Sequence, residues 1–150
     1  MLTTAIVTYF HFVSIILLFV ALTVEKILFK QSIDQKTARR ILVFDSLYGI
    51  AALILLTTGL LKFFLYGKGS GYYIHNYLMW IKLALFSIVG ILSIYPTVYF
   101  LKWRKILKRD EEVVISEEAY KKISLLIHLE LAIAILIPLL ATLLARGFGV

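Results

Sequence analysis

Six ionisable side chains lie within or at the ends of long apolar stretches of this sequence, where side chains capable of chemistry are rare. A charge at the centre of a membrane is unfavourable by about 2.5–3.5 kcal/mol or more, so such residues are candidates for ligand binding or proton transfer. An imidazole can ligate haem iron, a carboxyl group can carry a proton or bind a cation, and an amine can hold an anion. The six residues are His11, Glu25, Asp45, Lys82, His128 and Glu130.

Helical spacing groups several of these residues with other small or polar side chains. On the first apolar segment, the row spaced by three and four residues is His11, Ser14, Leu18, Ala21 and Glu25. Residues with that spacing share one face of a helix. Lys82 begins a similar row on a later segment, and Asp45 shares a face with Tyr48. We expect these faces to converge inside a bundle of helices.

The composition of the chain predicts a membrane protein. Of its 150 residues, 61% are hydrophobic and 17% are charged, and the mean hydropathy is +0.94. About 20 apolar residues are needed to cross a hydrocarbon core of about 30 Å. The sequence therefore predicts an all-α fold, a polytopic four-transmembrane-helix bundle that forms a single domain over residues 1–150. The expected helices cover about 2–24, 41–64, 77–101 and 117–146, and Ser116 is the expected cap of the last.

The distribution of basic residues predicts the orientation of the chain in the membrane. Lys and Arg total 16 against 9 acids, and 12 of the 16 lie in or beside the first and third connections. Basic loops are retained in the cytoplasm, so both termini are expected outside it. The net charge of +7 is thereby explained without a nucleic-acid partner. The first apolar run has no basic n-region or cleavage site, which favours a helix retained in a bacterial cytoplasmic (inner) membrane.

This orientation divides the ionisable residues into two layers. At a rise of about 1.5 Å per residue, His11 and Lys82 fall in the outer half of the membrane. The cytoplasmic half is expected to hold Glu25, Asp45, Tyr48 and His128. Glu130 is separated from His128 by about 200° around a helix, so only one of these two side chains can face the bundle centre.

Each candidate also has a purely structural interpretation. His11 and His128 can simply hydrogen-bond to a neighbouring helix, and Lys82 can extend its amine towards the outer headgroups. The absence of cysteine excludes disulfides, thiolate metal sites and cysteine-attached haem. Small residues allow helices to approach closely, and Gly49, Ala52 and Gly59 are therefore expected at helix contacts.

Several short motifs resemble those of a small bacterial membrane-protein family of unknown function. The resemblance covers essentially the whole chain and implies a topology without an activity. The motifs are Tyr9-Phe10-His11, Asp45-Ser46-Leu47-Tyr48-Gly49, Trp80-Ile81-Lys82-Leu83 and Tyr95-Pro96-Thr97.

The segment with His11 and the Trp80-Ile81-Lys82-Leu83 motif are also distantly similar to the haem-dependent, oxygen-independent protoporphyrinogen IX oxidases. This resemblance implies that His11 ligates haem iron and that Lys82 is a basic residue required for activity. It also implies oxidation of a tetrapyrrole with transfer of electrons to a membrane quinone.

Three functions remain open on the sequence alone. The first is a membrane oxidoreductase that binds haem b or a quinone, with Lys82 as catalytic residue and His11, Lys82, Tyr48, Asp45 and His128 at the cofactor. The second is a small transporter or proton-relay subunit. The third is an accessory or assembly subunit of a membrane complex. The expected partners are the lipid bilayer and either a second copy of the chain or another membrane protein.

Overall fold

A computed structural model of the protein describes residues 1–66 and 69–149, and this part of the chain is helical without strands. Its four long helices are α1 (Leu2–Leu28), α2 (Gln35–Leu61), α4 (Tyr77–Lys108) and α5 (Glu117–Ala145). A π-helical turn, η1 (Lys62–Tyr66), prolongs α2, and the short α3 (Ser70–Ile74) precedes α4. Each long helix is long and apolar enough to cross a membrane. The predicted all-α, four-helix membrane fold is confirmed.

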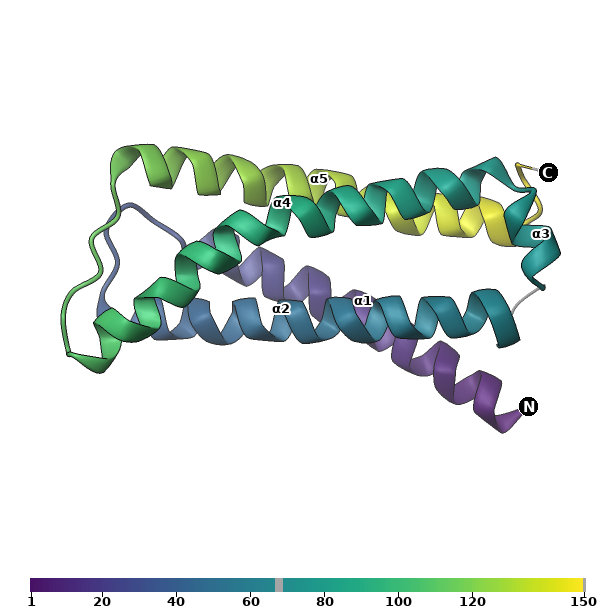
Figure 1. Cartoon of the computed structure of the whole chain (residues 1–150), viewed down its shortest axis with the longest axis horizontal. Coiled ribbons are helices and arrows are strands. Elements are labelled where there is room, and N and C mark those ends of the chain that lie inside the picture. Colours follow the sequence, from purple (N-terminus) through teal and green to yellow (C-terminus); the bar gives the residue numbers. More distant parts are fainter. Residues whose placement is uncertain (67–68, 150) are drawn as a thin grey trace.

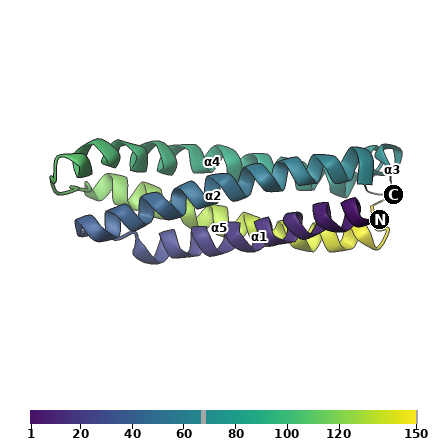
Figure 2. The ribbon, with the colours of Figure 1, turned by 90° about the horizontal axis from the view of Figure 1, so that it is seen from below.

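The four long helices run along one axis as two antiparallel pairs (Figures 1 and 2). Helix α1 pairs with α2 and α4 pairs with α5, while contacts of α2 with α4 and of α1 with α5 join the pairs. Both termini lie at one end of the bundle, which we call the termini end, and the connections 29–34 and 109–116 lie at the other, the loop end. The N-terminal half of α1 diverges from α4 and α5 (Figure 1).

An aromatic cluster holds the loop end together. Phe29, directly after α1, packs against Phe100 of α4 with ring centroids 5.5 Å apart, and Phe100 packs against Trp103 at 4.9 Å. Tyr120 of α5 stacks on Phe29 from the other side of the bundle at 5.7 Å. Three helices thus meet in one buried apolar core, which fixes their relative positions in this half.

Polar caps and loop contacts define where the helices begin at the loop end. Asp34 accepts a hydrogen bond from the backbone N–H of Thr37 at 2.9 Å, which lowers the pKa of Asp34. Ser116 accepts from the backbone N–H of Ala119 at 3.2 Å, as expected for the cap of α5. The Gln35 amide donates to the carbonyl of Asp110 at 2.8 Å and links the two connections.

At the termini end, the C-terminal segment closes over the start of α4. The amide of Asn76 donates to the carbonyl of Phe148 at 2.8 Å, and the hydroxyl of Tyr72 donates to the carbonyl of Leu144 at 2.9 Å. Gly149 has a φ of +88°, and a Cβ there would lie 2.5 Å from Asn76 Oδ1. Only glycine fits this position, because any other side chain would be both strained and blocked.

Two details differ from the sequence predictions. Helix α2 begins at Gln35 and α4 continues to Lys108, because a helix proceeds beyond its apolar run until a cap or turn stops it. The expectation that Gly49 lies at a helix contact is wrong: a Cβ there would meet nothing within 4 Å. Ala52 packs against the core, and a Cβ on Gly59 would lie 3.6 Å from His11 Cε1.

Candidate functional site

A cavity of about 160 Å³ lies in the termini-end half of the bundle and is lined by residues of all four long helices. Three basic side chains line it: His11 from α1, Lys62 from η1 and Lys82 from α4. The remaining lining residues are Gly59, Phe63, Tyr73, Met79, Ala141, Leu144 and Ala145. The structure thus brings His11 and Lys82 to one site and adds Lys62, which the sequence analysis did not select.

A hydrogen bond across two helices orients the His11 ring. His11 Nδ1 lies 3.0 Å from Thr58 Oγ1 of α2, and this hydroxyl also lies 2.7 Å from the carbonyl oxygen of Ile54. The single hydroxyl hydrogen goes to the carbonyl, which can only accept, so Thr58 accepts from the Nδ1–H of His11. The neutral ring then keeps its lone pair on Nε2, where it can accept a proton or bind a metal.

The cavity carries positive charge without an acidic side chain among the described residues that line it. Lys62 and Lys82 are the charged groups that interact electrostatically with His11, and Lys62 interacts in the same way with Lys82. The Lys62 amine lies 5.7 Å from the ring centroid of Phe12, a cation–π contact that holds it beside α1. Such a site favours an anion or a ligand with electron-rich oxygens.

Asp45 and Tyr48, which were predicted for the cytoplasmic layer, take part in contacts that lie nearer the loop end. The Thr97 hydroxyl donates to Asp45 Oδ1 at 2.6 Å, and the Tyr48 hydroxyl donates to Glu130 Oε2 at 3.1 Å. Ten residues of α2 separate Tyr48 from Thr58, about 15 Å along the helix axis at 1.5 Å per residue. Asp45 and Tyr48 therefore do not share the cavity of His11 and Lys82.

The alternative between His128 and Glu130 is settled in favour of Glu130 as the residue that faces the interior. Glu130 is 1% exposed, whereas His128 is exposed on the outside of α5 with its Nδ1 near the carbonyl of Ser124 in the same helix. The structure therefore places His128 apart from the other predicted site residues. Sequence spacing showed that these two side chains cannot both face the bundle centre but did not select between them.

Lys62 was missed because it ends an apolar run and therefore looks like an ordinary interfacial residue. The signal that could have identified it is its spacing: Lys62 follows Thr58 and Gly59 by four and three residues, so the three share a helix face. Among residues 1–66 and 69–149, no three His, Cys, Asp or Glu side chains form a group that could hold a metal ion.

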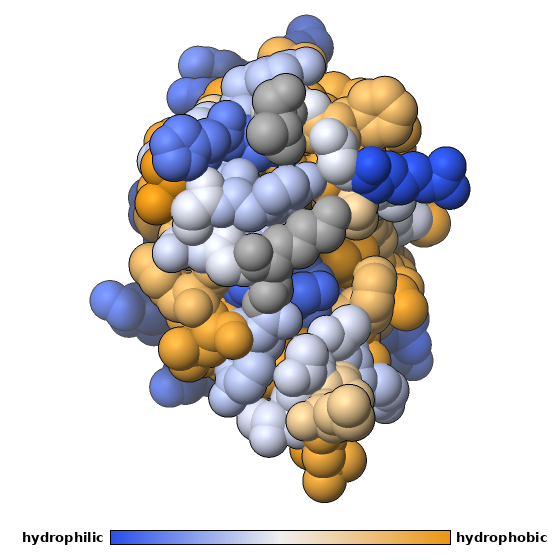
Figure 3. Space-filling model, turned by 90° about the vertical axis from the view of Figure 1, so that its right-hand side faces the viewer, coloured by the Kyte–Doolittle hydropathy of each residue, from blue (hydrophilic) through white to orange (hydrophobic). Residues whose placement is uncertain are grey.

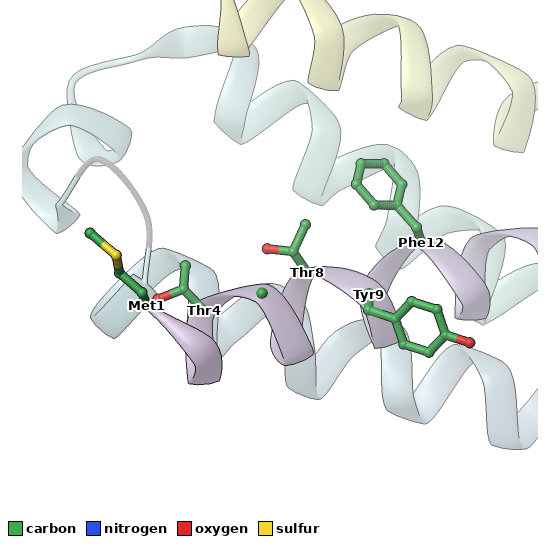
Figure 4. A pocket seen from close by; sticks show the side chains of 6 residues that line it. Met1, Thr4, Thr8, Tyr9 and Phe12 are labelled. Atoms are coloured by element: carbon green, nitrogen blue, oxygen red, sulfur yellow. The ribbon is translucent and has the colours of Figure 1, made fainter.

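A second hollow is an open groove of about 630 Å³ along the diverging part of α1. Figure 4 shows Thr4, Thr8 and Phe12 along one side of this helix, with Tyr9 directed away from them. All of its lining residues belong to the first twelve of the chain. The groove adjoins the basic cavity through Phe12, which lines the groove and lies beneath the Lys62 amine.

The end face of the bundle next to the cavity is mixed in character. Figure 3 views the molecule from the termini end, where near-neutral residues occupy much of the middle and strongly hydrophilic and strongly hydrophobic residues both appear around the edges.

Comparison with known proteins identifies one family. The chain matches, over residues 3–149, the family described as "Predicted membrane protein (DUF2214)". No curated protein and no solved structure matches the chain, and a link to the protoporphyrinogen IX oxidases is not shown. With four membrane-spanning helices and a match that covers nearly its whole length, the chain belongs to the DUF2214 family of predicted membrane proteins.

Proposed function

We propose that this membrane protein binds the headgroup of a membrane quinone in the basic cavity at the termini end. The observation that carries the proposal is the convergence of His11, Lys62 and Lys82 from three segments on one cavity of about 160 Å³. Quinones reside in the hydrocarbon phase, and these helices are apolar enough to lie in it. Aromatic and aliphatic lining residues supply a suitable surface for a ring.

The size of the cavity favours a single ring. A cavity of about 150 Å³ in another protein accommodates benzene, whereas pockets for larger ligands measure roughly 300–1,000 Å³. Our cavity of about 160 Å³ matches the first class. A porphyrin consists of four pyrrole rings joined by methine bridges and does not fit in this volume, so haem b is supported less well than a quinone as the ligand of His11.

The polar groups suit both oxidation states of a quinone. The carbonyl oxygens of the oxidised ring accept hydrogen bonds from the ammonium groups of Lys62 and Lys82, and charge-assisted hydrogen bonds of this kind are the stronger ones. A hydroxyl of the reduced ring can donate to the free Nε2 of His11. Lys82 would stabilise negative charge on the ring during reduction, and the electrons would come from a partner membrane protein.

Titration of the purified protein with short-chain ubiquinone and with menadione, followed by calorimetry in detergent, tests this proposal. Loss of a hydrogen bond from a charged group weakens an interaction by about 1.5–3 kcal/mol, so Lys82→Met and Lys62→Met should each bind roughly 10- to 100-fold more weakly. Lys105→Met, which removes an exposed amine from the same helix as Lys82, should bind like the wild type. Wild-type protein that binds neither quinone would overturn the proposal.

Absorption spectroscopy separates the quinone from haem. If the purified protein is colourless with and without added haem, haem b is excluded as its ligand and the quinone proposal stands. A Soret band that disappears in His11→Ala would instead show that His11 ligates iron and that the cavity opens to admit a porphyrin.

The charge distribution supports an orientation in which the loop end faces the cytoplasm. Of the 16 basic residues, 12 lie in or beside the connections at this end, and basic segments are retained in the cytoplasm. In a bacterial inner membrane, the cavity with His11 and Lys82 would then lie in the outer half, and both termini would be outside.

A further inference from the structure

Three carboxyl groups converge in the loop-end half of the bundle from three different helices. Glu25 belongs to α1, Asp45 to α2 and Glu130 to α5. The three residues are 2%, 4% and 1% exposed, respectively. Asp45 and Glu130 are the charged groups that interact electrostatically with Glu25, so the three buried carboxyls lie within electrostatic range of one another inside the bundle. This cluster is separate from the basic cavity and takes no part in the proposed binding of a quinone.

Two oxygen atoms of this cluster are buried without a partner. Within the described residues, Glu25 Oε1 and Glu130 Oε1 have no hydrogen-bond partner. A carboxylate needs donors for both oxygens when it is removed from water, because burial of an unpaired charge is strongly unfavourable. A neutral carboxylic acid avoids that penalty and can itself donate a hydrogen bond.

The groups that face the cluster from each helix determine which carboxyl is ionised. From α4, the Thr97 hydroxyl donates to Asp45 Oδ1 at 2.6 Å, and Arg104 is the cation that acts on Asp45. From α2, Tyr48 donates to Glu130 Oε2. From α1 and α5, the facing groups are Glu25 and Glu130.

These neighbours favour ionisation of the three carboxyl groups to different extents. Burial disfavours the anion of Asp45, but Asp45 has a hydroxyl donor and a nearby guanidinium, both of which favour the anion. Among the described residues, the charged neighbours of Glu25 are the acids Asp45 and Glu130. The charged neighbour of Glu130 is Asp45, and its hydroxyl donor is Tyr48. Like charges disfavour further ionisation, so protons belong on the two glutamates.

We propose that Glu25 and Glu130 form a proton-binding site within the membrane, in which both carboxyls hold a proton at neutral pH beside an ionised Asp45. As the pH rises, one carboxylic acid transfers its proton to solvent water or hydroxide; its O–H bond breaks, and the electron pair stays on the oxygen of a carboxylate beside the other members of the cluster. The two glutamates therefore release their protons in separate steps as the pH rises. The ligand proposed for this site is the proton.

Infrared spectroscopy of the full chain in lipid nanodiscs tests the proposal directly. Protonated carboxyl groups absorb apart from carboxylates, and the wild-type protein at pH 7 should show this band. Labelling with ¹³C-glutamate should shift the band, and labelling with ¹³C-aspartate should not. This result needs no variant and is independent of any quinone. Absence of the band at pH 7, or a shift on aspartate labelling alone, would overturn the proposal.

Variants locate the protons. Glu25→Gln and Glu130→Gln should each remove about half of the band, and the double variant should remove it. The matched control is Glu117→Gln at the exposed start of α5, where Glu117 pairs with Lys121, and it should leave the band unchanged. Loss of the wild-type band when sodium replaces choline at constant ionic strength would show a cation site in its place and would also overturn the proposal.

Discussion

At the scale of single residues, the hydrogen bond between His11 and Thr58 is the best-defined interaction of the basic cavity. It joins α1 to α2 and selects the tautomer that leaves Nε2 of His11 available. A side chain on the lipid-facing side of the same helix turn offers a comparison: Thr57 is exposed, and its hydroxyl donates to the carbonyl of Leu53 at 2.9 Å within its own helix.

Thr58→Val should therefore destabilise the protein by about 0.5–1.5 kcal/mol, the usual net contribution of one hydrogen bond. Valine keeps the shape of threonine but cannot accept the Nδ1–H of His11. Thr57→Val should leave the free energy of unfolding within about 0.5 kcal/mol of wild type, as surface substitutions do. Both values can be measured by denaturant unfolding in mixed micelles. Equal effects of the two substitutions would show that the interhelical bond contributes nothing.

Gly59 and Gly49 form a second matched pair on α2. Gly59→Leu should destabilise the protein by about 1–3 kcal/mol, the range for overpacking, because the new side chain would extend towards His11, which is 3.6 Å from the Cβ position. Gly49→Leu should not destabilise it, because nothing lies within 4 Å of that position and leucine is the better helix former. A thermal midpoint unchanged in Gly59→Leu would place this face of α2 towards lipid.

At the scale of helices, the two N-cap side chains at the loop end differ in their response to pH: Asp34 of α2 is a carboxylate that can be protonated, and Ser116 of α5 is a hydroxyl. Hydrogen bonds from Thr37 lower the pKa of Asp34, so its stabilising contribution is present above the pKa of the unfolded state and is lost as the pH falls through the folded-state pKa. The Ser116 cap of α5 is a hydroxyl, and its contribution does not depend on pH.

Asp34→Ala should consequently lower the thermal midpoint at pH 7, and the difference from wild type should shrink as the pH falls through the acidic range. Ser116→Ala should lower the midpoint by an amount that stays constant over the same range. Scanning calorimetry of the three proteins at several pH values makes the comparison. A deficit of Asp34→Ala that persists unchanged at low pH would contradict the assignment of Asp34 as an ionised cap.

The sequence predicted where the helices lie in the chain much better than which face of each helix points into the bundle. Runs of about 20 apolar residues identify spanning segments directly, because a membrane requires that length. The inward face of a helix is harder to predict, because the lipid and the bundle core are equally apolar. The row that starts at His11 indicated the inward face of α1 correctly, since Ser14 and Glu25 on it are both buried.

The inward face of helix α5 could not be predicted from its sequence. The two ionisable side chains within its apolar run, His128 and Glu130, point to different sides, and nothing in the spacing shows which side meets the bundle. The structure decides between them through a contact with Tyr48, which is 82 residues away in the sequence. Similarly, the cavity depends on the meeting of four helices, and its size could not be derived from any one of them.

At the scale of the whole molecule, the two clusters lie in different halves of the bundle and have opposite character. The termini-end cavity contains basic groups, and the loop-end cluster contains acids. Because the clusters are separate, either proposal can fail without the other. Quinone binding is tested by titration of the Lys62 and Lys82 variants, and proton binding is tested by infrared spectra of the Glu25 and Glu130 variants.

The orientation of the molecule decides on which side of the membrane each cluster is nearer. Both termini lie at one end (Figure 1), so they must share a side. Basic residues gather at the other end, at Arg39, Arg104, Lys105, Lys108 and Arg109 among others, and an energised membrane opposes the transfer of basic residues out of the cytoplasm. We therefore expect an alkaline phosphatase fused after Val150 to be active in cells, because that enzyme folds only outside the cytoplasm. The same enzyme inserted after Lys108 should be inactive, while a green fluorescent protein at Lys108 should fluoresce. The opposite pattern would place the basic cavity in the cytoplasmic half and the carboxyl cluster in the outer half.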